Sequence, residues 1–235
     1  MSEPVVLVTG GAGNVGLAVT AAFLRRGARV VVPLYKTDHP APLEALGSAH
    51  AGRLHTFALD LTTERGAEQA VQQAVEWGGR ISAVAHLMGG YAGGVLLADT
   101  PMNVWDRMMD LNVKSAWLIS RFSLPRMVEQ GGGAFVFVSS RSAIRGRAGH
   151  GAYAVAKSAL LTLVEAIAEE YGKQGIRANA VMPGTVDTEA NRRASPGADH
   201  SLWTPPEQIA EVIAFLASPE SAAINGAAIP VYGRS

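Results

Sequence analysis

The sequence of 235 residues contains no cysteine, few aromatic residues (6%) and no excess of charge of either sign. Without cysteine, disulfides, thiolate catalysis and cysteine-ligated metals are excluded. Twenty basic residues balance twenty acidic ones in no like-charged blocks, so nothing in the charge pattern favours nucleic acid or a membrane surface as a partner. The apolar runs are too short for a membrane span or a signal peptide. We expect a cytoplasmic protein without a metal site, a nucleic-acid partner or a membrane partner.

What the sequence does contain is a high proportion of apolar residues, 48%, against 17% charged residues. This composition is typical of a globular chain, and the length suffices for a substantial core. No internal repeat and no linker rich in Pro, Gly or Ser divides the chain, so residues 1–235 are expected to form a single domain. The longest irregular segment, 183–205, is the expected substrate and cofactor loop, because loops of that length in small domains are commonly functional.

Short runs of β-branched residues alternate with longer amphipathic stretches along the chain. The runs predict seven strands, at Val5–Val8, Arg29–Val32, His55–Leu59, Ser82–His86, Phe135–Val138, Arg177–Val181 and Ala228–Val231. The stretches between them predict helices, at Val15–Arg26, Thr63–Trp77, Val104–Glu129, Gly151–Tyr171 and Pro206–Leu216. Such alternation predicts an α/β fold, a doubly wound parallel sheet of seven strands with helices on both faces.

A glycine-rich turn follows the first expected strand. In "VTGGAGNVG", Gly10, Gly13 and Gly16 stand between a strand and a helix, where a dinucleotide's pyrophosphate can approach the backbone and the helix N-terminus. The alternative is a glycine-rich turn without a ligand. Asp60, in "ALDL" at the end of the third strand, can accept a hydrogen bond from an adenine amino group or simply cap the following helix.

Tyr153 and Lys157 are four residues apart in "GAYAVAKSAL", and on a helix they share one face. For an arbitrary pair of this spacing, a buried tyrosine and a lysine reaching to water is the usual explanation. A catalytic explanation also exists, because an ammonium near a phenol favours the phenolate and lowers the pKa of the phenol toward neutral pH.

Seven short motifs occur in order along the chain: "TGGAGNVG" at 9–16, "LDL" at 59–61, "LNV" at 111–113, "VSS" at 138–140, the Tyr153/Lys157 pair, "NAVMPGTVDT" at 179–188 and "INGAAIPVYG" at 224–233. Together they resemble the compact single-domain branch of the short-chain dehydrogenase/reductase family over nearly the whole chain. Ser140 lies thirteen residues before Tyr153, which is the family's spacing. The resemblance implies a Rossmann-type fold and a catalytic tetrad of Asn112, Ser140, Tyr153 and Lys157.

The same resemblance assigns roles to these residues. Tyr153 is expected to exchange a proton with a substrate oxygen, which Ser140 holds by a hydrogen bond. Asn112 is expected to hold a water, its alternative being a polar residue that bends a helix. The implied cofactor-binding residues are Gly10, Gly13, Asn14, Val15, Gly16, Lys36, Asp60, Leu61, Gly89, Tyr153, Lys157, Pro183, Gly184, Val186 and Thr188.

Two stretches depart from the common family pattern. Asn14 replaces a glycine of the loop, and we expect it to be tolerated because Asn adopts left-handed geometry more readily than most residues. "HLMG" at 86–89 replaces Asn-Asn-Ala-Gly, which should affect stability more than chemistry.

The substrate region resembles dihydropteridine reductases, in "GGYAGG" at 89–94 and in residues 187–205. There Tyr91 and Trp203 are predicted to sandwich a planar substrate, with His150 nearby; packing of loop against core is the alternative. Three functions follow, in order of preference. They are an NAD(P)(H)-dependent oxidoreductase acting on a small carbonyl or alcohol, a reductase of a pterin-type C=N bond, and a nucleotide sensor without catalysis. Ser140 suits a carbonyl substrate.

Cofactor choice and assembly are predicted from smaller features. Leu34 stands where NAD-preferring relatives carry a carboxylate, and Lys36 can neutralise a 2′-phosphate, so we predict NADP(H), with NAD(H) possible. An arrangement in which Asp38 turns back toward the cofactor is considered less favourable, because Lys36 intervenes. Apolar residues on several faces of 104–129 and 151–171 predict a two-fold symmetric homotetramer, or otherwise a dimer.

Overall fold

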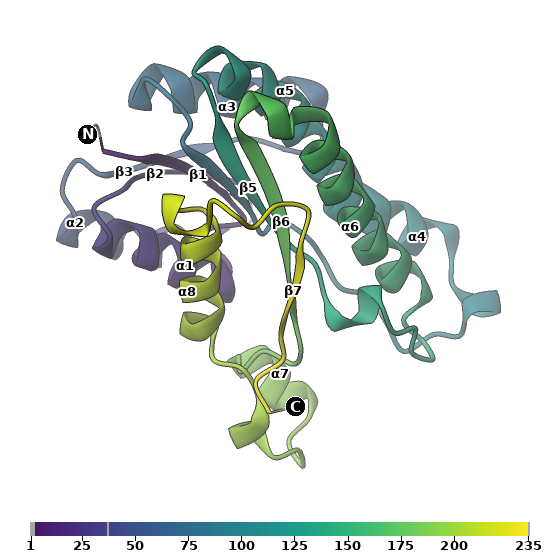
Figure 1. The fold of residues 1–235 in the computed structure, drawn as a ribbon. Helices are drawn as coiled ribbons and strands as arrows, with labels where there is room; N and C mark the ends of the chain where they lie inside the picture. Colours follow the sequence, from purple (N-terminus) through teal and green to yellow (C-terminus); the bar gives the residue numbers. More distant parts are fainter. Residues whose placement is uncertain (1–2, 37, 235) are drawn as a thin grey trace.

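Seven parallel strands form one sheet in the order β3-β2-β1-β4-β5-β6-β7 in the computed structural model, which describes residues 3–36 and 38–234 (Figure 1). The strands are β1 Val5–Thr9, β2 Arg29–Leu34, β3 Leu54–Ala58, β4 Ala83–His86, β5 Gly133–Val138, β6 Ile176–Pro183 and β7 Ala228–Val231. All seven expected strands are present, and the doubly wound Rossmann-type fold class is confirmed. Because β1 is flanked by β2 on one side and β4 on the other, the strand order reverses there, which is where open α/β sheets bind ligands.

Helices cover both faces of the sheet (Figure 1). The helices α1 and α8 pack against each other on one face, whereas α3, α5 and α6 cover the other. Their bounds are α1 Asn14–Arg25, α2 Ala41–Ala49, α3 Glu64–Gly78, α4 Met102–Met109, α5 Ser115–Glu129, α6 Gly151–Tyr171, α7 Glu189–Ala194 and α8 Pro206–Leu216.

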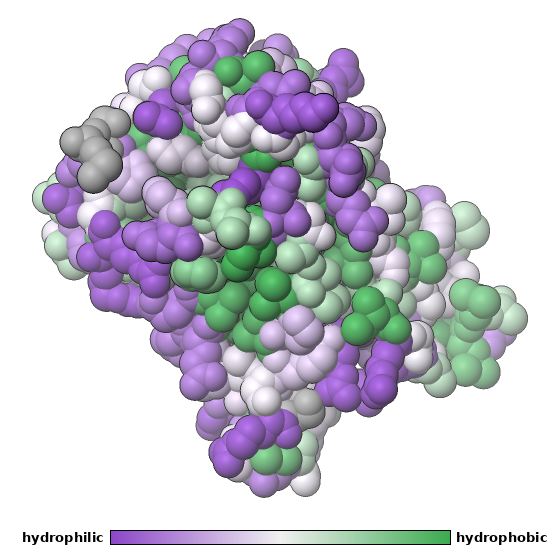
Figure 2. All heavy atoms as spheres, viewed as in Figure 1, coloured by the Kyte–Doolittle hydropathy of each residue, from purple (hydrophilic) through white to green (hydrophobic). Residues whose placement is uncertain are grey.

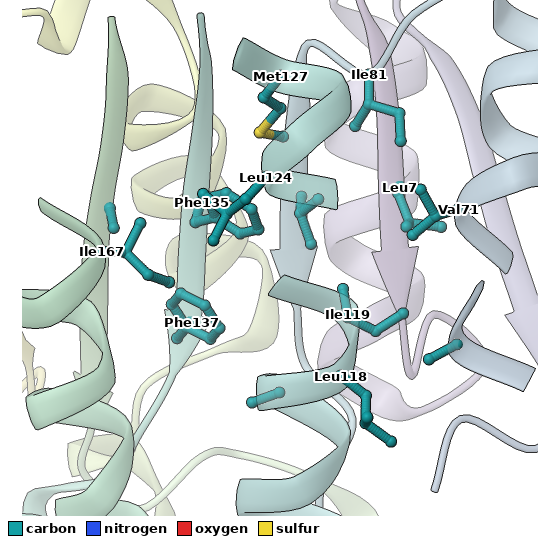
Figure 3. Packing of buried hydrophobic residues seen from close by; sticks show 14 of the residues in the cluster. Leu7, Val71, Ile81, Leu118, Ile119, Leu124, Met127, Phe135, Phe137 and Ile167 are labelled. Atoms are coloured by element: carbon teal, nitrogen blue, oxygen red, sulfur yellow. The ribbon is translucent and has the colours of Figure 1, made fainter. Parts of the chain in front are cut away.

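The sheet is buried on both faces because alternate side chains of each strand enter different cores. On β5, Phe135 and Phe137 enter the core under α5 and α6, whereas Ala134 and Val136 face α1 and α8. In Figure 3 Phe135 lies beside Leu124 of α5, and Phe137 lies near Ile167 of α6. Such strands contain near-continuous apolar runs, which is why the sequence identifies them well.

The expected helix Val104–Glu129 is divided. Residues Met102–Met109 are α-helical, Asp110–Lys114 form one π-helical turn, and α5 continues from Ser115. Two short helices were not expected. Of α2, only Leu43 is buried, and α7 lies inside the segment expected to be irregular, so neither presents a periodic apolar stripe.

One helical stretch, Gly151–Gln174, is long and apolar enough to cross a membrane by length and composition alone, contrary to the expectation that no segment reaches that length. In the structure it packs on β6, and its buried stripe includes Lys157. A helix of a protein core satisfies the same criteria of length and composition.

Asn179 fastens the last strand to the sheet. Its Nδ2 donates to the Ile224 carbonyl oxygen at 2.9 Å, and its Oδ1 accepts from the Ala227 amide at 3.0 Å. Asn179→Ala leaves both backbone groups without this partner, so we expect the free energy of unfolding in urea to fall by about 2–3 kcal/mol. Asn103→Ala, at an exposed position, should change it by less than about 0.5 kcal/mol. Equal effects of the two substitutions would contradict this role.

Candidate active site

The glycine turn brings the backbone of β1 close to the start of α1. Gly10 has a φ of +69°, which favours glycine. A Cβ atom on Gly16 would lie 2.1 Å from the Gly10 carbonyl oxygen, so only glycine fits there. The first α1 hydrogen bond of this turn runs from the Leu17 amide to the Gly13 carbonyl oxygen, which leaves the preceding helical N–H groups available to an anion.

Asn14 does not need the left-handed geometry for which its tolerance was invoked. It is the first residue of α1, and no described non-glycine residue has a positive φ. The residue before it, Gly13, is in an extended conformation at φ −74°. The asparagine therefore occupies an ordinary helical position, and the loop is intact for a simpler reason than expected.

A groove of about 750 Å³ lies at the carboxyl ends of the strands beside this turn. It is lined by five of the expected cofactor-binding residues, namely Gly10, Gly13, Asp60, Leu61 and Gly89. Asn14, Val15 and Gly16 form the adjoining first turn of α1. A Cβ atom on Gly89 would lie 2.5 Å from Asn112 Oδ1 and 3.1 Å from Lys157 Nζ, so the absence of a side chain there leaves room beside these two polar groups.

The turn after β2 corrects one expectation. Asp38 does fold back: its Oδ2 accepts from the Tyr35 amide at 2.7 Å, and both residues line the groove. Lys36 is exposed, with its Nζ 5.6 Å from the Tyr35 ring centroid, and it is not among the groove-lining residues. The carboxylate of Asp38 thus reaches the groove because the Tyr35 amide holds it there, and the intervening Lys36 does not prevent this.

Asp60 lies in the turn before α3 but is not the N-cap of that helix. Its Oδ1 accepts from the amide and the hydroxyl of Thr62, at 3.0 Å and 2.6 Å, in the turn that leads into α3. The helix itself is capped by Thr63, whose Oγ1 accepts from the Gly66 amide. Asp60 nevertheless lines the groove, so its structural role in the turn also places it where a nucleotide would lie.

Tyr153 and Lys157 share a face of α6, as the spacing predicts, with Lys157 Nζ 5.9 Å from the Tyr153 ring centroid. Lys157 is buried, and its ammonium donates to the Val138 carbonyl oxygen at 2.9 Å. Burial lowers the pKa of Lys157 to about 8. Ser139, which the sequence analysis did not single out, fixes this arrangement because its hydroxyl donates to the Lys157 carbonyl oxygen at 2.8 Å.

Ser140 precedes a short helical turn, and its Oγ accepts from the Ser142 amide at 3.1 Å. Burial raises the pKa of Tyr153 above its ordinary value, a hydrogen bond with Ser140 opposes this shift, and Tyr91 adds to it. The expected net lowering by Lys157 is therefore not found, because desolvation of the phenol outweighs the other influences. At neutral pH, Tyr153 keeps its proton.

Asn112 lies within the π-helical turn and is buried. Its Oδ1 accepts from the Gly90 amide at 3.2 Å, while its Nδ2 donates to the carbonyl oxygens of Gly90 and Met108. The amide thus holds the segment after β4 against the break between α4 and α5. This position agrees with the alternative given for Asn112, a polar residue that bends a helix. Turns of the π type are frequent at functional sites.

The three expected substrate residues form two separate groups. Tyr91 is 61% exposed and meets the Tyr153 ring edge-on, with centroids 5.1 Å apart. Its hydroxyl lies 3.4 Å from His150 Nε2. Trp203 packs instead on His200, at 4.4 Å between centroids. No ring contact joins Tyr91 and Trp203 in the part of the chain that the structure describes, so the predicted sandwich is not formed by the protein alone.

The loop 183–205 is more regular than expected. Pro183 ends β6, and the Gly184 amide donates to the Val231 carbonyl oxygen at 3.2 Å. Val186 forms a bridge with Thr204. Thr188 caps α7, since its side chain accepts from the Asn191 amide at 3.2 Å. These contacts hold the segment at the carboxyl end of β6.

The replacement "HLMG" supplies a buried histidine that sequence reasoning treated only as a departure. His86 Nδ1 lies 2.9 Å from the Thr9 hydroxyl, and its Nε2 lies 3.3 Å from the Ser115 hydroxyl. The ring thus joins the end of β1 to the start of α5. Burial, aided by the charge of Lys157, lowers the pKa of His86 from 6.5 to about 3.

The comparisons with known proteins agree with this geometry. Residues 10–233 match the family described as enoyl-(acyl carrier protein) reductase. The chain is 31% identical over 250 residues to 2-(S)-hydroxypropyl-CoM dehydrogenase 3 of Xanthobacter autotrophicus, covering 99% of this chain and 96% of the relative. It is 28% identical to 3-oxoacyl-[acyl-carrier-protein] reductase of Thermotoga maritima, covering 97% and 96%. The chain belongs to the short-chain dehydrogenase/reductase family.

Solved structures show the same likeness. A short-chain type dehydrogenase/reductase from Mycobacterium ulcerans superposes with a TM-score of 0.93 at 28% identity, covering 99% of this chain and 90% of that one. A blue fluorescent protein from a metagenomic library, in complex with NADPH, gives 0.90 at 28%, covering 99% and 98%. An NADH-dependent reductase responsible for alginate metabolism gives 0.87 at 27%, covering 99% and 96%.

The protein is therefore an NAD(P)-dependent oxidoreductase that acts on alcohol or carbonyl substrates. A role as a nucleotide sensor without catalysis is set aside by this result. The finer resemblance to dihydropteridine reductases is not shown by these comparisons.

The buried His86 predicts a measurable pH dependence. The unfolded chain protonates this histidine below about pH 6.5, whereas the folded chain keeps it neutral down to about pH 3. Its share of stability is complete above pH 6.5 and is lost as the pH falls, by up to about 1.4 kcal/mol per pH unit. Urea unfolding at several pH values should therefore show a weaker acid loss for His86→Gln than for wild type. His39→Gln, at an exposed position, is the control; identical slopes for all three proteins would exclude this role.

Proposed function

We propose that Tyr153, Ser140 and Lys157 catalyse proton transfer during reduction of a small carbonyl compound. The observation that carries the proposal is the position of Tyr153, which hydrogen bonds with Ser140 and lies one helical turn from Lys157. The ammonium of Lys157 in turn adjoins Gly89, which lines the groove. A phenol whose pKa is raised stays protonated at neutral pH and can donate to a carbonyl oxygen that gains negative charge. Ser140 would hold that oxygen by a hydrogen bond.

The groove fits a nicotinamide dinucleotide. The cradle around Gly10 and Gly16 has no room for side chains, and the N-terminus of α1 favours a pyrophosphate. When bound, the cofactor supplies the hydride that reduces the carbonyl carbon. Lys157 keeps its positive charge at neutral pH, since its pKa is about 8, and would bind the nicotinamide ribose. Asn112 would hold the segment at Gly89–Gly90 open beside it.

Further parts of the proposal follow from position. Pro183, Gly184, Val186 and Thr188 would cover the nicotinamide, because their contacts hold the loop at the end of β6. Tyr91 and His150 would border the substrate, since Tyr91 contacts the ring of Tyr153. The cytoplasmic location expected from the sequence stays a prediction.

The first test replaces the catalytic phenol. Tyr153→Phe should lower turnover by about 10²–10⁴-fold, the usual contribution of general acid catalysis, while leaving cofactor affinity nearly unchanged. Lys157→Ala should reduce both turnover and cofactor affinity. Tyr171→Phe, at the far end of the same helix, is the matched control. Cofactor binding measured by fluorescence and steady-state rates on a panel of ketones decide the matter, and wild-type turnover in Tyr153→Phe would refute the assignment.

Cofactor choice depends on the turn after β2. We propose NADP(H) as the preferred cofactor on the basis of Lys36, which has no carboxylate before it at Leu34. Asp38 acts against this preference, because its carboxylate lines the groove and would repel a 2′-phosphate. The preference therefore requires the charge of Lys36 to outweigh that of Asp38.

Opposite substitutions separate the two charges. Wild type should bind NADPH about tenfold more tightly than NADH, equivalent to about 1.4 kcal/mol. Lys36→Ala should remove that preference, and Asp38→Asn should enlarge it. Titration of each reduced cofactor by fluorescence gives the ratios directly. Tighter binding of NADH by wild type would show that Asp38 prevails and that the sequence-based preference is wrong.

A homotetramer with two-fold symmetry is supported by two exposed apolar surfaces. On the first, Trp117 of α5 is 58% exposed and Val155 of α6 is 46% exposed. The second lies around β7, whose outer edge pairs with no strand in the described chain, and α8, where Phe215 is 41% exposed. Figure 2 shows an apolar area at the centre of the face that carries α8 and β7.

Light scattering tests the assembly. At micromolar concentration we expect a mass of four times the 24.6 kDa chain, with two times as the fallback. Trp117→Glu should reduce the mass by separating the contact through α5 and α6. Met102→Glu, an exposed apolar position on α4 outside both surfaces, should not. A wild-type protein with the mass of one chain would refute the proposal.

A further inference from the structure

The buried imidazole of His86 lies between two buried hydroxyl groups. Its Nδ1 is 2.9 Å from the Thr9 hydroxyl at the end of β1, and its Nε2 is 3.3 Å from the Ser115 hydroxyl at the start of α5. A neutral imidazole has one N–H donor and one acceptor nitrogen, so the two nitrogens must take different roles. The other partners of the two hydroxyls decide which nitrogen carries the proton.

The Ser115 hydroxyl fixes the tautomer. It lies 2.7 Å from the Leu111 carbonyl oxygen, which can only accept, so the hydroxyl proton points there. The Ser115 oxygen is then an acceptor for the ring, and His86 Nε2 carries the proton. With the proton on Nδ1 instead, Ser115 would have to donate to the ring, and the two oxygens 2.7 Å apart would have no hydrogen between them.

The contacts on the other side of the ring have the same direction. His86 is neutral at neutral pH, because burial lowers its pKa to about 3, so Nδ1 accepts from the Thr9 hydroxyl. Thr9 Oγ1 in turn accepts from the Met88 amide at 3.3 Å. The contacts therefore form one directed chain of hydrogen bonds, which passes through the Met88 amide, Thr9, His86, Ser115 and the Leu111 carbonyl oxygen.

Both ends of this hydrogen-bond chain lie at the cofactor groove. Met88 and Leu111 line the groove, and a Cβ atom on Gly10 would lie 2.8 Å from the Met88 amide nitrogen, so this backbone abuts the glycine turn. At the other end, the Ser115 amide donates to the Asp110 carbonyl oxygen, five residues back, whereas the Ser115 hydroxyl reaches Leu111. The side chain thus makes the contact that the amide would make in a regular α-helix.

The two ends enclose Gly89. On one side of it, the Met88 amide begins the hydrogen-bond chain. On the other side, Asn112, in the π-helical turn where the chain ends, bonds the amide and the carbonyl oxygen of Gly90. Gly89 itself lines the groove, and a Cβ atom there would lie 3.1 Å from Lys157 Nζ. A change at the imidazole would therefore move the backbone that borders the ammonium.

We propose that His86, in its Nε2–H tautomer, is a positioning residue for the cofactor site. It holds the backbone around Gly89 in the conformation that leaves room for the dinucleotide beside Lys157, and it takes no part in proton transfer. This inference rests on the proposed cofactor groove. It gives "HLMG" a part in cofactor binding, beyond the effect on stability expected from the sequence.

Nitrogen-15 NMR of the intact protein tests the tautomer. Long-range correlations between ring protons and ring nitrogens at neutral pH should show His86 with a protonated Nε2 and an unprotonated Nδ1. His86→Gln, which lacks the ring, identifies these signals among those of the six histidines. A protonated Nδ1 or a doubly protonated ring would overturn the proposal.

Matched serine variants test the positioning. Ser115→Ala removes the hydroxyl that meets His86, whereas Ser120→Ala removes a buried hydroxyl of the same helix that donates to the Ala116 carbonyl oxygen at 2.7 Å. Each variant loses one hydroxyl-to-carbonyl hydrogen bond, so a merely structural role predicts the same cofactor affinity for both. Fluorescence titration with NADPH and with NADH should show about fivefold weaker binding for Ser115→Ala alone, the loss expected for one hydrogen bond.

Thermal unfolding of each variant is measured first. Thr9→Val, which keeps the shape of the side chain without the hydroxyl, interrupts the hydrogen-bond chain on the other side of the ring and replaces Ser115→Ala if the latter does not fold. Equal affinities of wild type and the interrupted variant, or equal losses in that variant and Ser120→Ala, would overturn the positioning role and leave the cofactor groove in place. Failure of wild type to bind either nucleotide would refute the proposed function and this inference together.

Discussion

The ammonium of Lys157 is buried beneath α6 with the Val138 carbonyl oxygen as its hydrogen-bond partner, and much of the site is arranged around that charge. Ser139 holds the helix backbone at the same residue. Gly89 leaves free the space that a side chain would take from the ammonium. A buried cation is costly unless something anionic or polar meets it, which makes this position suited to a ligand rich in hydroxyl and phosphate oxygens.

The sequence predicts the strands and the shared helix face of Tyr153 and Lys157 for one physical reason: both follow from local patterns of residues. Val5–Thr9 and Gly133–Val138 are apolar runs buried on both faces, and Tyr153 and Lys157 are related by one helical turn. No comparable local pattern indicates the contact between Asp38 and Tyr35. There the Asp38 carboxylate accepts from the Tyr35 amide, a contact that no short sequence pattern indicates. Nor does a local pattern indicate that Tyr91 contacts the ring of Tyr153 and Trp203 that of His200.

The two faces of the sheet are packed with strand side chains of different size. Under α5 and α6 the strands present phenylalanines, and the space is filled. On the other face, the strands present alanines and valines, which are buried in one cluster with α1 and α8. At the carboxyl end of the sheet, the lack of side chains at Gly10 and Gly16 allows close contact between backbone segments. Small residues therefore shape the site end of the sheet by letting the backbone of β1 and the start of α1 come close together.

The π-helical turn at Asp110–Lys114 sets the rotational phase of everything that follows it in α5. A π-turn holds one residue more than an α-helical turn, and each residue in an α-helix advances the facing direction by about 100°. Without the extra residue, the buried stripe that contains Leu118 and Ile119 would be rotated by about 100° relative to Asn112. A substitution in this segment changes a side chain, whereas insertion or deletion of a residue changes the direction in which the side chains of α5 face. The number of residues in this segment, more than their identity, thus fixes which face of α5 meets the sheet.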